Sequence, residues 1–291
     1  MGLMKHLKAM LRGGKTDISA RYVRLREAIS GTMSKFYMAR DRQTGKIVGL
    51  KILDRVQSAL FEARFKGLNK PTEGEISTAL PAHPHLVKTF EHGLTTEDEQ
   101  YLVMEFIEGQ GINSLITGAS ELLDSRHVEL IRQAAQALDA VHEAGFIHRD
   151  VCPRNFIVSP DGQNLKLIDF GLTVPDKQEF KKPGNRTGTP NYMSPEVIRR
   201  QRTDKRLDIF SFGVTAFELC TFELPWPHCN TGPDAMRHAT EDPTPIDQYR
   251  PKIHPKLAEV IHRCLKVEPS DRFQSMKQLI DMLAGLEHED Q

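Results

Sequence analysis

Hydrophobic and polar residues follow a strand-like pattern in the first third of the chain. Apolar and polar residues alternate over 21–29 and 46–53, and bulky side chains crowd 36–40. Period-two alternation and bulky residues favour β-strands. Two more strands are expected at 86–91 and 100–106. The pattern therefore predicts a lobe rich in strands.

Helical spacing dominates the remainder of the chain. Over 130–144, apolar residues recur every three or four positions, which places them on one face of a helix. The predicted helices are 56–68, 72–80, 130–144, 209–221, 255–265 and 275–286. Because the strands come first and most helices afterwards, we expect an α+β fold of two lobes joined near residues 105–109.

The first 20 residues form a basic leader segment. Its apolar residues would share one face of a helix; they are Leu3, Leu7, Met10 and Leu11. A frayed or packed leader helix is the favoured interpretation, and a helix lying on a membrane surface is the alternative.

Composition narrows the classes of protein. Thirty-nine basic residues balance 39 acidic ones, so the formal net charge is zero and a nucleic-acid binder is disfavoured. The four cysteines form no CxxC pair, which argues against a zinc ribbon and favours reduced thiols in a cytoplasmic protein. No apolar run reaches the roughly 18 residues that a membrane span needs.

Three motifs in a fixed order carry the candidate chemistry. They are His148-Arg149-Asp150 with Asn155 downstream, then Asp169-Phe170-Gly171, then Gly188-Thr189-Pro190 leading to Pro195-Glu196. In this order and spacing they resemble the signature of the eukaryotic-type protein kinase family, and the resemblance covers residues 21–285. It implies a bilobal fold, with a small β-rich N-lobe at 21–107, a larger α-helical C-lobe at 108–286 and a tail at 287–291.

The resemblance also implies roles for the polar residues. Phosphoryl transfer depends mainly on positioning and on neutralising charge. Asp150 stands where the family keeps the carboxylate that accepts or orients the proton of the substrate hydroxyl. Asn155 and Asp169 match the positions that hold magnesium, and both offer hard oxygen ligands. Lys51 matches the strand lysine that grips the α- and β-phosphates of ATP.

The glutamate partner of Lys51 is less clear from the sequence. Glu75 is the first choice, although it lies one residue off the family's usual spacing, and Glu73 is the runner-up. The run from Thr72 to Glu75 also has the pattern of a capping box, so Glu75 could instead close the start of a helix.

The positions expected to contact the nucleotide depart from the family pattern. Ile29, Gly31 and Ser34 align with the three glycines of the phosphate loop, so we expect a stiffer cover and weaker or slower binding. Phe36 adds bulk above the adenine and Gly49 removes it, which suggests a reshaped pocket. The remaining implied contacts are the gatekeeper Met104, the backbones of Glu105 and Ile107, and the floor residue Ile157.

The catalytic loop carries a second departure. Serine/threonine kinases usually place a lysine where Cys152 stands, and a cation appears instead at Arg154, as in tyrosine kinases. Arg154 is expected to supply the missing charge, the alternative being a solvated arginine at the rim. Thr189, which the family bonds to the catalytic aspartate, indicates a serine or threonine acceptor and leaves dual specificity open.

Two residues are regulatory candidates. Arg149 directly precedes Asp150, and an arginine there can pair with a phosphate on the activation loop. Thr187 is the candidate phosphorylation site in that short basic loop, and ordering of the loop without modification is the alternative.

Further positions are expected to be structural. Asp208 should cap the backbone of the catalytic loop, and Arg272 should form a buried ion pair with Glu196. His83 and His85 are expected to be ordinary loop histidines, since no further metal ligands stand nearby.

The sequence thus predicts a serine/threonine-protein kinase that uses ATP and Mg²⁺ to phosphorylate protein substrates. The alternative is a pseudokinase that acts as a nucleotide-binding scaffold, favoured by the eroded phosphate loop and by Cys152. A small-molecule kinase is a third, weaker hypothesis. The substrate, the pathway and the oligomeric state do not follow from the sequence.

Overall fold

The computed structural model describes residues 14–26, 29–30, 33–65, 67–184, 187–287 and 290. The chain divides into two compact units, Met1–Ala79 with Val87–Ile107, and Leu80–Leu86 with Glu108–Gln291. The leader segment expected at the start of the chain lies outside the described residues, apart from its last few positions.

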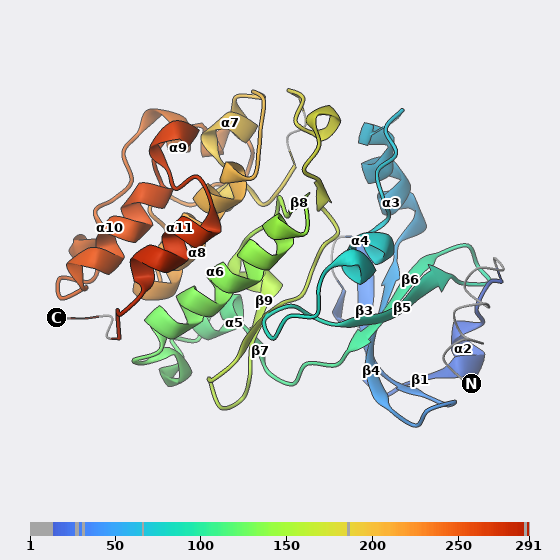
Figure 1. Ribbon diagram of the computed structural model, residues 1–291. Helices are drawn as coiled ribbons and strands as arrows, with labels where there is room; N and C mark the ends of the chain where they lie inside the picture. Colours follow the sequence, from blue (N-terminus) through green and yellow to red (C-terminus); the bar gives the residue numbers. More distant parts are fainter. Residues whose placement is uncertain are drawn as a thin grey trace. The chain divides into compact units, whose positions relative to one another are not determined.

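The first unit is built on an antiparallel sheet (Figure 1). Among the described residues it has six strands, ordered β1-β3-β4-β6-β5, with β2 paired to β3. The strands are β1 (Tyr22–Arg24), β2 (Ile29–Ser30), β3 (Ser34–Asp41), β4 (Ile47–Leu53), β5 (Thr89–Leu94) and β6 (Gln100–Glu105). Its helices are α2 (Ile18–Arg21), α3 (Arg55–Glu62) and α4 (Glu73–Ala79).

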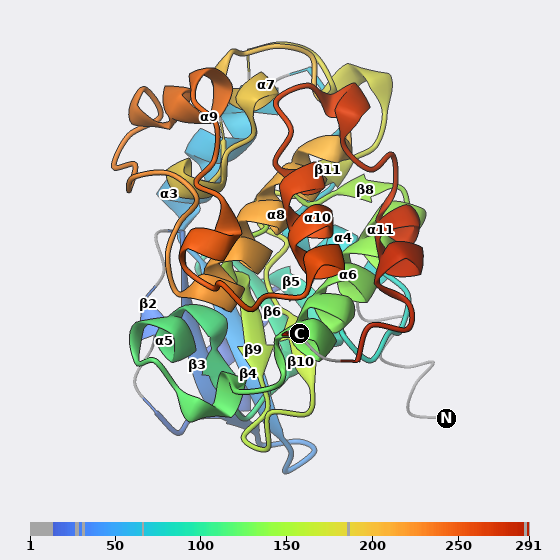
Figure 2. The same ribbon diagram turned by 90° about the vertical axis from the view of Figure 1, so that its left-hand side faces the viewer.

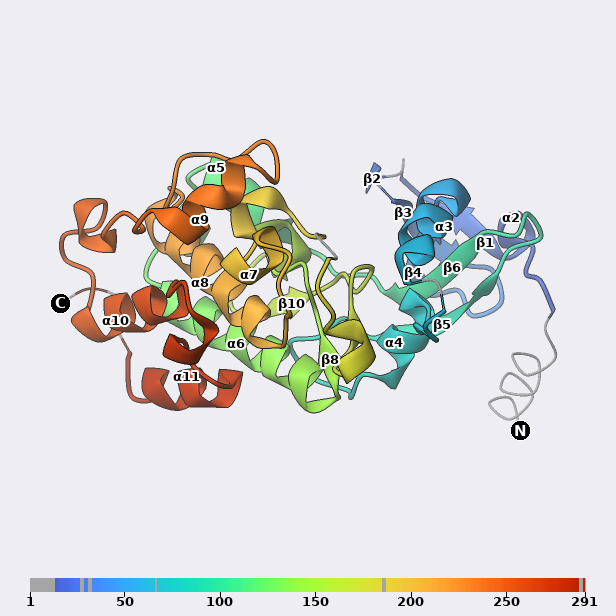
Figure 3. The ribbon, with the colours of Figure 1, turned by 90° about the horizontal axis from the view of Figure 1, so that it is seen from above.

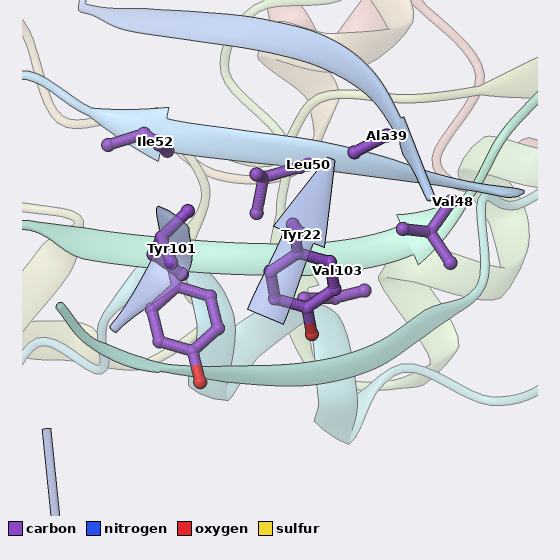
Figure 4. Packing of buried hydrophobic residues seen from close by; sticks show 8 residues of the cluster. Tyr22, Ala39, Val48, Leu50, Ile52, Tyr101 and Val103 are labelled. Atoms are coloured by element: carbon purple, nitrogen blue, oxygen red, sulfur yellow. The ribbon is translucent and has the colours of Figure 1, made fainter. Parts of the chain in front are cut away.

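One cluster of buried hydrophobic residues in the first unit lies on one face of this sheet (Figure 4). Side chains alternate between the two faces of a strand, so β4 sends Val48, Leu50 and Ile52 to the core. Leu50 and Val103 lie next to the ring of Tyr22 in the same cluster. The opposite face of β4 carries Gly49 and Lys51, which places these two residues away from this cluster.

The second unit is mainly helical (Figures 1 and 2). Its helices are α5 (Ile112–Thr117), α6 (His127–Glu143), α7 (Pro195–Ile198), α8 (Arg206–Thr221), α9 (Arg237–Thr240), α10 (Pro255–Cys264) and α11 (Met276–Leu283). Short strands form two small sheets. In one, β9 (Phe156–Val158) lies between β10 (Leu165–Leu167) and β7 (Gln110–Gly111); in the other, β11 (Val174–Pro175) pairs with β8 (Phe146–Ile147).

Helix α8 is buried along nearly its whole length. A helix that is apolar on every side belongs in a core, and α8 contacts both α10 and α6. In the view from above, α7 and α9 lie close together, and these two helices are also in contact (Figure 3). Within the described ranges, no helix combines the length and the apolar character needed to cross a bilayer.

The α+β fold expected from the sequence is confirmed, with differences at the ends of elements. The strand expected at 21–29 is two short strands, β1 and β2, which pair with different parts of β3. The helix expected at 56–68 ends at Glu62 and continues as a single 3₁₀ turn to Phe65. Sheet register and packing set these boundaries, and local periodicity does not contain that information.

A buried ion pair joins two distant segments of the second unit, as the sequence predicts. The Arg272 guanidinium donates to both carboxylate oxygens of Glu196, each at 2.8 Å. Its other N–H groups donate to the backbone carbonyls of Lys266, Val267 and Arg206. Arg272 is fully buried, and these contacts use all five donors of its guanidinium.

Removing one partner of this pair should destabilise the second unit strongly. We expect Arg272→Met to lower the free energy of unfolding by about 3–5 kcal/mol, because the Glu196 carboxylate would keep its charge in a buried site. Urea unfolding measures the change. The control is Lys277→Met, which breaks an exposed pair with Asp281 and should cost less than about 1 kcal/mol. Equal losses in the two variants would contradict this account.

Candidate functional site

Three polar side chains of the second unit converge on Asp150. Its Oδ1 accepts hydrogen bonds from the Thr189 hydroxyl at 2.8 Å and from the Thr189 backbone N–H at 3.2 Å. Its Oδ2 accepts from Arg154 at 3.0 Å and from the Asn155 amide at 3.1 Å. The structure therefore brings together Asp150, Arg154, Asn155 and Thr189, which the sequence places in two separate motifs.

The loop that carries Asp150 is held by a carboxylate from α8. Asp208 accepts hydrogen bonds from the backbone N–H groups of His148 at 2.8 Å and of Arg149 at 2.7 Å. It also bonds His142 Nε2 at 2.8 Å. Burial opposes ionisation of this carboxyl, but the hydrogen bond and charge of His142 and the other donors outweigh it, so the pKa of Asp208 is lowered. The predicted capping role of Asp208 is confirmed.

This tether fixes an unusual backbone conformation directly before Asp150. Arg149 has a φ of +70°, in the left-handed region that non-glycine residues rarely adopt. Such a conformation persists only where surrounding contacts enforce it. Here the bond from the Arg149 N–H to Asp208 supplies the constraint, and the turn that results directs the next residue, Asp150, toward Thr189.

Cys152 and Arg154 differ sharply in environment. The Cys152 side chain is buried, and burial raises the pKa of its thiol to about 12, so it carries no charge near neutral pH. The side chain of Arg154 is 54% exposed and contacts the Asp150 carboxylate. Of these two residues, only Arg154 presents charge beside Asp150.

Asn155 and Asp169 offer oxygen atoms to a metal ion. The Asn155 amide nitrogen donates to the backbone carbonyl of Asp150 at 2.7 Å, which leaves the amide oxygen as an acceptor. The Ile168 N–H donates to the Asn155 carbonyl at 3.0 Å, so the two segments run side by side just before Asp169. A carboxylate and an amide oxygen suit a hard cation such as Mg²⁺. The described residues hold no cluster of three or more His, Cys, Asp or Glu suited to a metal.

In the first unit, Lys51 pairs with Glu73 and not with Glu75. The Lys51 ammonium lies 2.6 Å from Glu73 Oε1, and both side chains are buried. Glu75 is exposed, and its Oε2 accepts from the Thr72 N–H at 2.8 Å and the Thr72 hydroxyl at 2.9 Å. The hydrogen bond from the Thr72 backbone lowers the pKa of the Glu75 carboxyl.

The first choice of Glu75 as the lysine partner is therefore wrong. The physical reason is helix geometry, because Glu73 lies on the buried face of α4 with Ile76 and Ser77. Glu75 points to the other face and forms the capping box that its spacing with Thr72 allows. Ile76 is apolar and stands three residues after Glu73. Because residues three apart share a helix face, this apolar position is the sequence signal that could have identified Glu73 as the inward carboxylate.

Phe36 and Gly49 compensate each other on the lysine-bearing face of the sheet. Phe36 lies opposite Lys51 in the β3–β4 register, and Gly49 lies opposite Met104 in the β4–β6 register. A Cβ atom at Gly49 would stand 2.7 Å from the Phe36 ring and 3.1 Å from Met104 Cγ. With a side chain at residue 49, the Phe36 ring would have to move from this position.

The other expected nucleotide positions are only partly described. Gly31 and the side chain of Ile29 lie outside the described residues, whereas Ser34 begins β3 opposite Leu53. Glu105 ends β6 and accepts a hydrogen bond from the Lys88 N–H at 2.8 Å. Ile107 is half-buried at the end of the first unit, and Ile157 is half-buried in β9 of the second.

A small cavity in the second unit lies beside Asp150. Arg149, Thr187, Gly188 and Met193 are among its lining residues. Thr187 is buried, and its hydroxyl has no hydrogen-bond partner in the part of the chain that the structure describes. Gly188 has a φ of +126°, and a Cβ there would stand 3.1 Å from the Arg149 carbonyl oxygen, so this position requires glycine.

The loop after Thr189 has anchors that the sequence analysis missed. The Tyr192 hydroxyl bonds Glu218 Oε2 at 2.5 Å, and the Ser211 hydroxyl donates to the Tyr192 carbonyl at 2.6 Å. Glu218 and Ser211 are both on α8, seven residues apart, so they lie on one face of that helix. The spacing of Ser211 and Glu218 in the sequence indicates a shared helix face, but nothing in the sequence identifies Tyr192 as the residue that both contact.

The two glutamates of α4 should differ in their contribution to stability. Glu73→Gln removes a buried charge that Lys51 contacts, and we expect it to lower the free energy of unfolding by about 3 kcal/mol. Glu75→Gln weakens one helix cap and should cost about 1 kcal/mol or less. Urea unfolding of both variants measures the difference. A larger loss for Glu75→Gln would show that the cap, and not the ion pair, dominates this region.

Comparison with known proteins places the chain in a family. The model of the protein kinase domain matches residues 22–283. The serine/threonine-protein kinase pkn2 of Myxococcus xanthus is 32% identical over 95% of this chain and 34% of its own length. The kinase pkn3 of the same organism is 31% identical over 83% of this chain and 45% of its own length. PknB of Mycolicibacterium smegmatis is 30% identical over 86% of this chain and 40% of its own length.

The chain thus spans less than half the length of these relatives, while the kinase domain model covers most of the chain. The matched region contains Lys51 and all three sequence motifs, including the one that carries Asp150. The chain belongs to the protein kinase domain family.

Proposed function

We propose that this chain is a serine/threonine-protein kinase, which transfers the γ-phosphate of Mg-ATP to serine and threonine hydroxyls of proteins. The observation that carries the proposal is the hydrogen bond of 2.8 Å from the Thr189 hydroxyl to Asp150 Oδ1. It joins the candidate base to the loop on which an acceptor residue would rest. The names of the relatives support the same activity.

Asp150 is the proposed base. The substrate hydroxyl oxygen attacks the γ-phosphorus, the bond from that phosphorus to the β,γ-bridging oxygen breaks, and ADP leaves with the electron pair. The hydroxyl proton passes to the Asp150 carboxylate. Hydrogen bonds from Thr189 and Asn155 orient the carboxylate before the substrate arrives, which is the positioning that this chemistry requires.

Arg154 is proposed to replace the lysine that is usual in serine/threonine kinases. Its guanidinium lies beside Asp150, is largely exposed and keeps its charge at any pH the folded protein survives. A forked cation there can contact the oxygens of the γ-phosphoryl group as their charge develops. Cys152, buried and uncharged, is assigned no role in the chemistry.

The metal ligands are assigned within the second unit, and the lysine that grips the phosphates is assigned within the first. Asn155 and Asp169 would hold magnesium, which when bound offsets the negative charge of the phosphate oxygens. Lys51, oriented by Glu73, is proposed to grip the α- and β-phosphates. The remaining proposed nucleotide contacts are Ile29, Gly31, Ser34, Phe36, Gly49, Met104, Glu105, Ile107 and Ile157.

Regulation through the activation loop is also proposed. Thr187 and Arg149 line the same cavity, and a phosphate on Thr187 is proposed to pair with Arg149. Because the Thr187 side chain is buried, the loop has to open before this hydroxyl can be modified. The four cysteines are buried and none of them is joined in a disulfide, which supports a reducing, cytoplasmic location.

Turnover of ATP tests the proposed function. We expect the wild-type chain to transfer phosphate from radiolabelled Mg-ATP to dephosphorylated β-casein. Asp150→Asn should lower the rate by about a hundredfold or more, because the amide cannot accept the proton. Asp169→Ala should lose activity through its metal site. Nucleotide binding without any transfer would contradict the enzyme and point to a scaffold.

Variants of Arg154 and Cys152 test the second departure from the family pattern, in which Cys152 stands in place of a lysine and the cation is at Arg154. Arg154→Ala should lower kcat by about tenfold to a hundredfold, because it removes the cation beside Asp150. Cys152→Ala should change kcat by less than about threefold, since the thiol is neutral and buried. Steady-state kinetics with the same acceptor measure both values. Equal, small losses would remove Arg154 from the proposed chemistry.

A further inference from the structure

A buried histidine contacts the backbone of the loop that follows Thr189. His238, on α9, is 1% exposed, and its Nδ1 lies 2.8 Å from the Met193 carbonyl oxygen. A carbonyl oxygen only accepts, so Nδ1 carries the proton and donates. Burial lowers the pKa of His238, which keeps the ring neutral and leaves Nε2 as an acceptor.

The other contacts of the ring fix its orientation. Nε2 faces the Cys229 sulfur at 3.8 Å, and the Cys229 thiol donates to the Pro227 carbonyl at 3.4 Å. The ring centroid lies 4.6 Å from that of Trp226 and 5.8 Å from that of Phe210. Trp226 is itself held by a hydrogen bond of 3.0 Å from its indole N–H to the Glu241 carbonyl. His238 therefore has little freedom to turn away from Met193.

The segment around Cys229 holds the same loop at a second point. The Cys229 backbone N–H donates to the Asn191 side-chain oxygen at 2.6 Å. Asn191 and Met193 lie on either side of Tyr192, which α8 anchors through Ser211 and Glu218. The loop is thus held on one side by α8 and on the other by the segment 229–238.

This loop connects His238 to Asp150. Thr189, whose hydroxyl lies 2.8 Å from Asp150, comes four residues before Met193. Met193, Gly188 and Asp150 all line the same small cavity. A shift of the Met193 carbonyl would therefore move the surface next to the acceptor hydroxyl, whereas the nucleotide-contacting residues proposed above have no contact with His238 among the described interactions.

We propose that His238 is a positioning residue for the protein acceptor, acting through the Met193 carbonyl and not through ATP. This inference rests on the proposed kinase function, because it assigns a role within that reaction. The donor at Nδ1 holds the loop that receives the substrate, and the neutral aromatic ring packs that donor against Trp226.

Two substitutions separate the donor from the ring. His238→Phe keeps an aromatic ring and removes the donor, whereas His238→Asn places an amide nitrogen near the position of Nδ1. The matched control is His262→Phe, because His262 accepts from the Ile246 N–H at 3.1 Å and touches the Phe217 ring without reaching the loop. Kinetics with dephosphorylated β-casein, and ATP hydrolysis without an acceptor, are measured for each.

We expect His238→Phe to lower kcat/KM for casein by about fivefold to tenfold, the effect of one lost buried hydrogen bond. The KM for ATP and the rate of ATP hydrolysis without an acceptor should change less than about twofold. His238→Asn should recover most of the loss, and His262→Phe should resemble the wild type. Equal losses in the Phe and Asn variants, or a parallel loss of ATP hydrolysis, would overturn the proposal.

Hydrogen exchange decides the inference if the wild-type chain transfers no phosphate and the proposed function fails. The peptide covering residues 188–194 should exchange faster in His238→Phe, and at the wild-type rate in His238→Asn and His262→Phe. Unchanged exchange in His238→Phe would reject the tether. If that variant does not fold, His238→Gln takes its place, because its amide reaches the position of Nε2 and not of Nδ1.

Discussion

The buried carboxylate of Asp208 is the constraint on which the second unit depends. A charge inside a protein is tolerated only when hydrogen bonds replace the water it has lost. Asp208 meets this need by taking the backbone N–H groups of His148 and Arg149, with His142 as a further partner. Those two N–H groups are thereby satisfied as well, so the left-handed turn before Asp150 and the burial of Asp208 stabilise each other.

The same helix organises the rest of the candidate site through its few polar groups. Ser211 and Glu218 hold Tyr192, and the carbonyl of Arg206 receives a hydrogen bond from the guanidinium of Arg272. These groups occur on a helix that is otherwise apolar and buried, where an unmatched polar group would be costly. Each partner of α8 is therefore confined to one place, and the loops that carry Asp150 and Thr189 are ordered relative to each other within the second unit.

The sequence predicts most of the elements, because burial on one face of a strand or helix leaves a period in the chain. It also predicts Arg272 with Glu196 and the capping role of Asp208, since each stands in a distinctive motif. It fails for Glu75, where two local patterns overlap in one short helix and only packing decides which carboxylate turns inward. The sequence contains no signal for the role of His238, because the partner of this histidine is a backbone carbonyl, which every residue has.

Departures from a family pattern should be compared in the folded structure, because two substitutions that are far apart in the sequence can lie in contact and compensate each other. Phe36 and Gly49 stand 13 positions apart in the printed chain, yet a side chain at residue 49 would collide with the Phe36 ring. The absence of a side chain at residue 49 therefore makes room for the Phe36 ring on this face. Cys152 and Arg154 have the same relation, since a neutral buried thiol at one position accompanies an exposed guanidinium beside Asp150 at the other. Counted singly, such differences suggest decay of the site; taken in pairs, one is linked by close packing and the other leaves a cation beside Asp150.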